Sequence, residues 1–312
     1  MAKVRVLRNK GGNFVVSKAC LNKNTMRFFK KAVRGARRLS NLITFRHSGL
    51  EVQHLQNFFS QALDREVRVD IFLPPGYFSE TTFYPVLFFN DGQDMEAVQM
   101  AATLENLYNR NKIPKIIVVA IHANQERMNE YGIASQADYK NRGAKAKNFT
   151  QFILKELIPT IQKRYRCASK VEDWVYGGFS LGGLSAFDIV WQHPEVFGKV
   201  GVFSGSFWWR SKPVDPADPD AHRIMQYLLS KDKKRPGLKF WLQTGTEDEQ
   251  EDRNNNGIID AIDDTLDIIK ALKNMGYREG DDIHYVEIKG GQHNLPTWSR
   301  IMPEFLQWAF GK

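Results

Sequence analysis

The sequence has few cysteines and no long apolar run, and both absences exclude classes of protein. Only Cys20 and Cys167 are cysteines among 312 residues, and neither lies in a C-x-x-C or metal-ligand spacing. This excludes a disulfide framework and indicates a reducing compartment or a fold that does not depend on disulfides. No stretch approaches about 18 apolar residues, and the first residues lack the apolar core of a signal peptide. We therefore expect no membrane span and no export signal, and we predict a cytoplasmic protein.

Acidic residues are absent from the first fifty positions, which contain thirteen Lys and Arg. This segment accounts for the formal charge of +9, because the rest of the chain carries 31 basic and 35 acidic residues, a balance of −4. The bulk of the chain has no global electrostatic reason to bind nucleic acid. We predict a basic, partly disordered arm over residues 1–50 and a single catalytic domain over 51–312. A targeting or interaction segment is the alternative for the arm.

Predicted strands and helices alternate from about residue 51. Short apolar runs rich in β-branched and aromatic residues are typical of strands buried on both faces, and apolar steps of three and four are typical of helices. The predicted strands are 66–73, 84–89, 115–121, 174–177, 199–203, 238–244 and 283–288, and the predicted helices are 95–111, 148–165, 185–193, 264–275 and one around 303–310. This order predicts an α/β fold whose central sheet is mostly parallel and covered by helices on both faces.

A candidate nucleophile lies in Gly178-Phe179-Ser180-Leu181-Gly182, which matches G-x-S-x-G between a predicted strand and a predicted helix. A serine hydroxyl is a weak nucleophile, so it must be exposed on a tight turn where a base can reach it, and flanking glycines permit that turn. The N–H of Leu181 at the helix start is placed to stabilise an oxyanion. We predict Ser180 as the nucleophile, with an ordinary Gly-rich turn as the alternative.

The general base should lie beyond a late strand, after the nucleophile in the chain. His293 fits, because it follows the strand 283–288 within a Gly-Gly loop that no regular element claims. Packing or capping better explains His284 inside that strand, His193 before a proline at a helix end, and His122 at the end of a strand that precedes the serine.

The orienting acid should come between Ser180 and His293 and follow another strand, so that it can fix the imidazole tautomer. The strand 238–244 leads into Gly245-Thr-Glu-Asp-Glu249, which makes Asp248 the first candidate. Glu247, Glu249 and Asp252 are close enough in the sequence to be alternatives.

A second oxyanion donor is expected in the loop after the strand 84–89. This loop is Asn90-Asp-Gly-Gln-Asp94, where Gly92 lets the backbone approach closely and the amide of Gln93 or Asp94 supplies the N–H. Asn-Asp-Gly is also a common turn sequence, so this assignment depends on the triad.

A twelve-residue segment from 252 to 263 fits the pattern of a calcium loop. Gly257 stands at its sixth position, where the loop turns sharply, and oxygen ligands are supplied by Asp252, Asn254, Asn256, the Ile258 carbonyl, Asp260 and Asp263. The twelfth position is Asp rather than Glu, and no clear helix precedes the loop. We therefore keep two alternatives, a structural Ca²⁺ that holds the Asp248 loop and an ion-free Asn-rich turn.

With these residues placed, the chain from about residue 60 resembles the putative-esterase family of α/β-hydrolases, which includes feruloyl and acetylxylan esterases, enterochelin esterases and mycolyltransferases. The segments that carry the resemblance are 65–77, 89–93, 177–187, 193–197, 204–209, 245–248 and 290–293. The resemblance implies the α/β-hydrolase fold, with Ser180 as nucleophile, Asp248 as acid and His293 as base. The arm lies outside it, and the calcium-like loop is not general in the family.

The sequence thus predicts a serine carboxylic-ester hydrolase that forms an acyl-enzyme on Ser180, with the amides of Gln93 and Leu181 as oxyanion donors. The expected substrates are small-molecule or glycan esters of carbohydrate-linked, phenolic or siderophore type, and no cofactor is required for catalysis. Acyl transfer to another alcohol and a non-catalytic binding or regulatory role are the alternatives.

Three aromatic side chains are candidates for the substrate cleft, because sugar and phenolic rings stack on aromatic rings. They are Tyr131, Trp208 and Trp209. The alternative for each is packing in the core.

Overall fold

The computed structural model describes residues 7–8, 14–15, 44–47, 49–55 and 58–311. The chain divides into two units, Met1–Ile43 and Thr44–Lys312. In the first unit, β1 (Leu7–Arg8) and β2 (Phe14–Val15) pair antiparallel. The predicted disorder of the arm otherwise concerns positions outside the described residues.

A central sheet organises the second unit and, over the described residues, contains nine strands in the order β13-β12-β11-β10-β8-β9-β7-β4-β3. The strands are β3 (Thr44–His47), β4 (Leu50–Leu55), β7 (Val69–Leu73), β8 (Val86–Asn90), β9 (Ile117–Ile121), β10 (Trp174–Phe179), β11 (Lys199–Phe203), β12 (Lys239–Glu247) and β13 (Ile283–Gln292). The strands from β13 to β9 run parallel, and β7, β4 and β3 pair antiparallel. The predicted mostly parallel sheet is confirmed.

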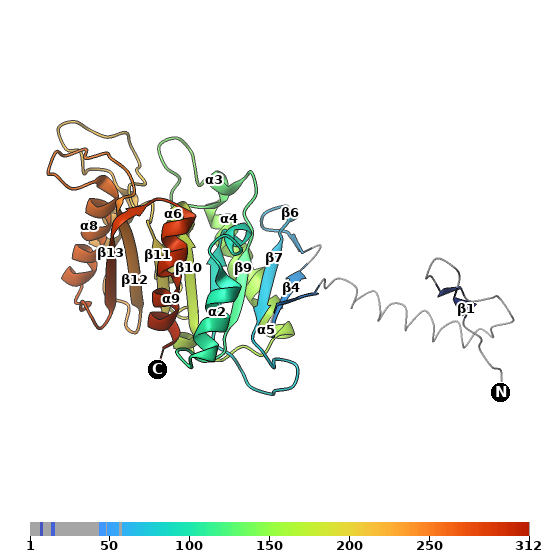
Figure 1. Cartoon of the computed structure of the whole chain (residues 1–312). Helices are drawn as coiled ribbons and strands as arrows, with labels where there is room; N and C mark the ends of the chain where they lie inside the picture. The colour runs from blue at the N-terminus through green and yellow to red at the C-terminus, as the bar shows by residue number, and fades with distance from the viewer. Residues whose placement is uncertain (1–6, 9–13, 16–43, 48, 56–57, 312) are drawn as a thin grey trace. The chain divides into compact units, whose positions relative to one another are not determined.

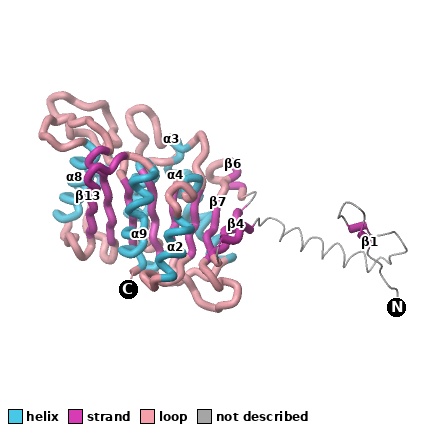
Figure 2. Tube along the Cα trace, in the orientation of Figure 1, coloured by secondary structure: helices cyan, strands magenta, loops and turns pink. Residues whose placement is uncertain are grey.

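Helices cover both faces of this sheet, as Figures 1 and 2 show. One face packs against α2 (Met100–Asn109) and α9 (Leu295–Phe310). The other face packs against α4 (Ala146–Gln151), the π-helical turn η2 (Phe152–Leu157), α5 (Ile158–Arg164), α6 (Ser180–Gln192), α7 (Ile224–Lys231) and α8 (Asp260–Asn274). The short pieces are β5 (Phe59–Ser60), β6 (Arg65–Glu66), η1 (Gly92–Asp94), α3 (Arg127–Glu130) and η3 (Val171–Asp173). No helix of the described residues has the length and apolar character needed to cross a membrane.

The alternation of side chains along the central strands builds the two cores. In β8, Val86 and Phe88 belong to the core under α4 to α8, whereas Leu87 and Phe89 belong to the core under α2 and α9. All residues of β7, β8, β9 and β10 are buried, because both faces of these strands are covered.

Several elements differ from the prediction. The sheet begins at Thr44, before the predicted boundary at residue 51, because β3 and β4 extend its edge. The last helix begins at Leu295 rather than near Pro303, since the side chain of Asn294 accepts the N–H of Thr297 and caps the helix. The sequence pattern did not predict α7.

The parallel strands bring several loops to one edge of the sheet. The carboxyl ends of β8, β10, β11, β12 and β13 lie at the same edge, because these strands are neighbours and share one direction. Ligand sites of open α/β sheets lie at this edge. The predicted catalytic residues Ser180, Asp248 and His293 follow three of these strands, and the predicted oxyanion donor Gln93 follows β8.

Candidate active site

Ser180 lies on a strained turn between β10 and α6. Its φ is 52°, in the left-handed region that residues with a side chain rarely adopt. The turn is tight because its glycines allow close packing. A Cβ on Gly178 would lie 2.4 Å from the carbonyl oxygen of Gly182, and one on Gly182 would lie 2.7 Å from Oδ2 of Asp91. The predicted strand–turn–helix context of Ser180 is therefore present.

Ser206 is the immediate polar neighbour of the candidate nucleophile. The Oγ atoms of Ser180 and Ser206 are 3.3 Å apart, and the N–H of Ser206 donates to the carbonyl of Ser180 at 3.2 Å. The loop after β11 thus holds the backbone of the strained turn.

Asp248 follows β12 and is buried, with the N–H of Gly245 donating to its Oδ2 at 2.9 Å. Its Oδ1 is buried and has no hydrogen-bond partner among the described residues. Burial raises the pKa of this carboxyl above its ordinary value, and the Gly245 N–H, the Ser204 hydroxyl and the charge of His293 oppose that rise. A buried acceptor without a donor is costly, and an imidazole N–H is a donor that could satisfy it.

The alternatives to Asp248 lie in different surroundings. Glu247 is exposed at the end of β12, and the carboxylate of Asp252 accepts the N–H groups of Asn256 and Gly257. Burial and the neighbouring charges of Asp260, Glu251 and Asp264 raise the pKa of Glu249 to about 7. The charge of His293 lowers the pKa of Asp248. This electrostatic interaction favours Asp248 over Glu247, Glu249 and Asp252 as the orienting acid.

His293 follows β13, and its ring packs edge-on against Trp298, with the ring centroids 5.2 Å apart at 76°. His293 is exposed at the surface, but the atoms packed around its ring desolvate it enough to lower its pKa below the ordinary value. The charge of Asp248 raises this pKa, whereas the charge of Arg127 lowers it further. The imidazole is therefore biased toward the neutral form that a general base requires.

The three side chains share one edge of the sheet without being joined by hydrogen bonds. Among the described residues, His293 has its ring contact with Trp298 and no hydrogen bond to Ser180 or Asp248. Catalytic hydrogen bonds often tighten only when substrate binds. The order of the strands thus brings the three side chains to one edge of the sheet. In this conformation no hydrogen bond among the described residues connects them for proton transfer.

The predicted oxyanion loop forms η1, directly after β8. The amides of Asp94 and Met95 donate within this turn, to the carbonyls of Asp91 and Gly92, which leaves the amide of Gln93 as the better of the two candidate donors. The amide of Leu181 lies in the first turn of α6, where helical N–H groups have no intrahelical partner.

An ion pair that the sequence did not reveal fixes this loop. Asp91 is buried with a φ of 59°, and its carboxylate accepts from Nε of Arg127 at 2.7 Å and from Nη2 at 2.8 Å. Burial lowers the pKa of Arg127 but the Asp91 carboxylate raises it above its ordinary value, so the guanidinium remains charged. The only local signal was the Asn-Asp-Gly turn, because Asp adopts the left-handed region more readily than most residues.

The prediction that Tyr131 and Trp209 line the cleft is wrong, because both rings are buried. Tyr131 is 1% exposed and its hydroxyl accepts the N–H of Asp91, so it supports the oxyanion loop from behind. Trp209 is 0% exposed. Trp208 is partly exposed, and the guanidinium of Arg142 lies 4.9 Å from its ring centroid. Its role in the cleft stays a prediction.

Two other histidines have structural partners. His122 and His54 both contact the buried carboxylate of Asp70, with His122 Nε2 at 2.8 Å from Oδ2. Burial raises the pKa of Asp70, but hydrogen bonds with His122, Arg68 and His54 outweigh it and bring that pKa to about 2. The packing or capping role predicted for His122 agrees with this geometry.

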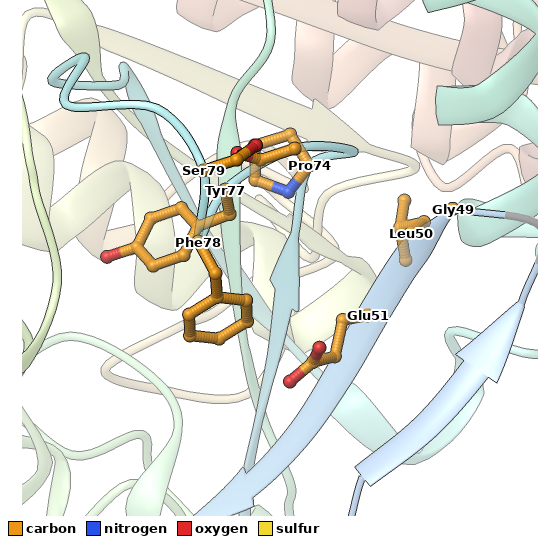
Figure 3. A pocket seen from close by; sticks show the side chains of 8 residues that line it. Gly49, Leu50, Glu51, Pro74, Tyr77, Phe78 and Ser79 are labelled. Atoms are coloured by element: carbon orange, nitrogen blue, oxygen red, sulfur yellow. The ribbon is translucent and has the colours of Figure 1, made fainter.

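A hollow of about 490 Å³ lies where β7 ends, and Figure 3 shows the side chains that line it. It is lined by Gly49, Leu50, Glu51, Pro74, Gly76, Tyr77, Phe78 and Ser79. Because β7 runs against its parallel neighbours, its last residues lie at the edge opposite Ser180. The hollow contains no histidine and is not part of the candidate active site.

The calcium-like loop is closed by hydrogen bonds within itself. The amides of Asn254 and Asn256 both donate to Oδ2 of Asp263, at 2.9 and 3.1 Å. Asp260 begins α8 and pairs with Arg253, whose guanidinium also contacts Asp220 and Asp264. The described residues contain no cluster of three acidic, His or Cys side chains arranged to hold a metal. All the predicted ligands offer oxygen, which suits Ca²⁺ chemically, so the calcium site stays a prediction.

Comparisons with known proteins agree on one family. A family model described as Putative esterase matches residues 60–309. Uncharacterized protein YbbA of Bacillus subtilis is 23% identical over 249 residues, which are 78% of this chain and 93% of that protein. An endo-1,4-beta-xylanase/feruloyl esterase of Xylanibacter ruminicola is 26% identical over 267 residues, 81% of this chain and 30% of the relative.

The solved structures show the same fold. The enterobactin esterase of Shigella flexneri superposes with a TM-score of 0.64 at 19% identity, over 85% of this chain and 60% of that chain. The chain therefore spans less than two thirds of this esterase and of the Xylanibacter relative. The fold is that of the α/β-hydrolases.

We predict that calcium stabilises the chain if the 252–263 loop binds it. At a free concentration about 100 times the Kd, a bound ion adds about 2.7 kcal/mol to the free energy of unfolding. The melting temperature, measured by differential scanning fluorimetry, should then be a few degrees higher in calcium than in chelator. Magnesium should give a smaller increase, and D263N should abolish the calcium effect. Identical melting temperatures in calcium and chelator would exclude the ion and leave the Asn-rich turn.

Proposed function

The chain belongs to the Putative esterase family, and we propose that it is a serine carboxylic-ester hydrolase with Ser180, Asp248 and His293 as its catalytic triad. The resemblance read from the sequence is confirmed by the family match. One observation carries the assignment of the nucleophile: Ser180 occupies a left-handed conformation at the start of α6, beside the oxyanion loop. The loops bearing Asp248 and His293 follow neighbouring strands on the same edge.

In acylation, Oγ of Ser180 attacks the ester carbonyl carbon while His293 takes the hydroxyl proton. The carboxylate of Asp248 stabilises the imidazolium that forms. The N–H groups of Leu181 and Gln93 stabilise the oxyanion of the tetrahedral intermediate. When this intermediate collapses, His293 gives its proton to the departing alcohol and Ser180 carries the acyl group.

In deacylation, His293 takes a proton from water, and the resulting nucleophile attacks the acyl carbonyl. The same two N–H groups stabilise the second oxyanion. Collapse breaks the bond to Ser180 Oγ, which regains its proton from His293, and the carboxylic acid leaves. No step requires a cofactor.

The proposed substrate is an ester of phenolic, siderophore or carbohydrate-linked type. Relatives named as a feruloyl esterase and as enterobactin esterases support a phenolic acyl group. Two features of the chain agree with this class. Trp208 offers a partly exposed ring two residues after Ser206, and the guanidinium of Arg127 lies close enough to His293 to affect its protonation. A partly exposed ring suits an aromatic acyl group, and a cation suits an acidic phenol or carboxylate.

We predict that a fluorophosphonate probe labels the wild-type chain and does not label S180A. Ester turnover in S180A should fall on the order of 10⁴- to 10⁶-fold, because the nucleophile is lost while the oxyanion donors remain. Intact-mass spectrometry measures the labelling. S206A is the matched control, since it removes the neighbouring hydroxyl and should still be labelled. Labelling that persists in S180A would refute the assignment, and an unlabelled wild type would favour a non-catalytic role.

A panel of acetyl, aryl, feruloyl and catecholate siderophore esters tests the substrate class. We expect the highest kcat/KM with an aromatic acyl group. W208A should lower kcat/KM for aromatic esters about 2- to 10-fold, the value of one aromatic contact, and leave the acetyl ester unchanged. Steady-state kinetics on matched ester pairs measure this difference. Equal losses on both esters would contradict the role of Trp208, and a preference for acetyl would exclude an aromatic acyl group.

The pH profile tests the base. His293 must be neutral to accept the proton, and desolvation of its ring by the packed neighbours lowers its pKa below the ordinary 6.5. The acid limb of kcat/KM should therefore have its midpoint below pH 6.5. R127Q removes a charge that lowers this pKa, so its limb should move to higher pH even where its activity is lower. A limb above pH 6.5 in the wild type, or one that moves down in R127Q, would contradict the assignment.

A further inference from the structure

Trp298, in the first turns of α9, contacts the segments that carry Ser180 and His293, and it also contacts the loop after β11, which lies beside Asp248. Its ring is 7% exposed and stacks on Phe179, the residue before Ser180, with centroids 4.7 Å apart at 7°. The ring of His293 meets it edge-on at 5.2 Å. Its Nε1–H donates to Oγ of Ser204 at 3.0 Å, in a buried hydrogen bond.

The hydrogen bond to Ser204 connects Trp298 to the acid. An indole N–H can only donate, so Ser204 Oγ must accept from it. The same hydroxyl lies close enough to Asp248 to lower the pKa of the carboxyl against the effect of burial. The hydrogen bond from Trp298 therefore constrains the orientation of the Ser204 hydroxyl beside the acid.

The backbone of Ser204 makes this orientation specific. Its φ is 47°, in the left-handed region, and its N–H donates to the carbonyl of Gln243 in β12 at 2.8 Å. The side chain is buried at 2% exposure, so solvent cannot replace either partner of the hydroxyl. A change at Trp298 would leave Ser204 in place with an unpaired oxygen.

The other two contacts act on the base and the nucleophile. The edge-on contact limits the rotation of the His293 ring, which has no hydrogen bond to Asp248 or Ser180 among the described residues to fix it. The stack on Phe179 supports β10 where it turns into the strained residue Ser180. One rigid ring thus fixes the relative positions of three loops from three strands.

We propose that Trp298 is the positioning residue of the triad, acting on Asp248 through Ser204 and on His293 through the edge of its ring. The proposal rests on the proposed function. Trp298 itself touches no reacting atom. Misplacement of a catalytic group by about 1 Å can cost about 100-fold in rate, so such a residue affects kcat more than KM.

The test compares W298F, S204A and the double variant W298F/S204A in the full chain. W298F keeps an aromatic ring and removes the N–H, and S204A removes the acceptor. Each single variant should lower kcat about 10- to 100-fold, with KM changed less than about threefold. The double variant should be no slower than the slower single variant, because the two residues form one hydrogen-bonded unit. The acid limb of kcat/KM should move to higher pH in both single variants, since the Ser204 hydroxyl that lowers the pKa of Asp248 is displaced in W298F and removed in S204A.

W308F is the control, because Trp308 lies on the same helix, is partly buried and packs on Phe305 at 6.2 Å. It should lower the melting temperature without changing kcat or the pH limb. Full kcat in W298F, multiplied losses in the double variant, or a loss of activity that follows the melting temperature as in W308F would each overturn the proposal. If W298F does not fold, the kcat, the acid limb and the melting temperature of S204A test the proposal in its place.

The rate of fluorophosphonate labelling separates this proposal from the proposed function. The wild type should be labelled at Ser180, and W298F should be labelled more slowly by about the same factor as kcat. An unlabelled wild type contradicts the proposed function. Labelling of W298F at the wild-type rate contradicts only the role of Trp298.

Discussion

The left-handed backbone at Ser180 is the constraint on which the rest of the site depends. A residue with a side chain at φ 52° costs free energy, on the order of 1–3 kcal/mol, and persists only when its surroundings hold it. The close approach of Gly178 to Gly182, the hydrogen bond from Ser206 and the packing of Phe179 against α9 all hold this turn. The hydrogen bond from Ser206 needs β10 and β11 to be parallel neighbours, because Ser206 follows β11. The strand order of the sheet is therefore one of the conditions that hold the turn at Ser180.

Much of the fold could be predicted because its signals are local. Apolar runs, helical periodicity and the glycines around Ser180 each act over a few residues. The edge strands β3 and β4 were not predicted, since their stability comes from pairing with β7 rather than from an apolar run; β4 alternates buried and half-buried positions. The start of α9 was misplaced because Pro303 resembles a first-turn residue, whereas the capping side chain of Asn294 begins the helix eight residues earlier.

Within the site, sequence order predicted Ser180, Asp248 and His293 because each follows a strand of the series, and the structure brings their loops to one edge of the sheet. It could not locate the residues that hold them, since Arg127, Ser204 and Trp298 act through contacts between distant parts of the chain. It also misjudged Tyr131 and Trp209. Aromatic residues serve cores and clefts equally well, and burial, which no local pattern reports, decides between the two.

The two halves of the site differ in how far they are organised before substrate arrives. The oxyanion side is fixed: Asp91 and Arg127 form a two-point ion pair, and the N–H of Ala123 donates to the side chain of Gln93 at 3.0 Å. The proton-transfer side is open, because Asp248 Oδ1 has no hydrogen-bond partner and His293 has no hydrogen bond, among the described residues. This division has a physical reason. Dipoles that stabilise a developing charge lose their advantage if they must reorganise during the reaction. A proton acceptor needs its alignment only once an ester carbonyl is in place for Ser180 to attack. The rigid ring of Trp298 packs against the imidazole of His293. This arrangement keeps the surroundings of the base fixed and lets the base align when the ester is in place.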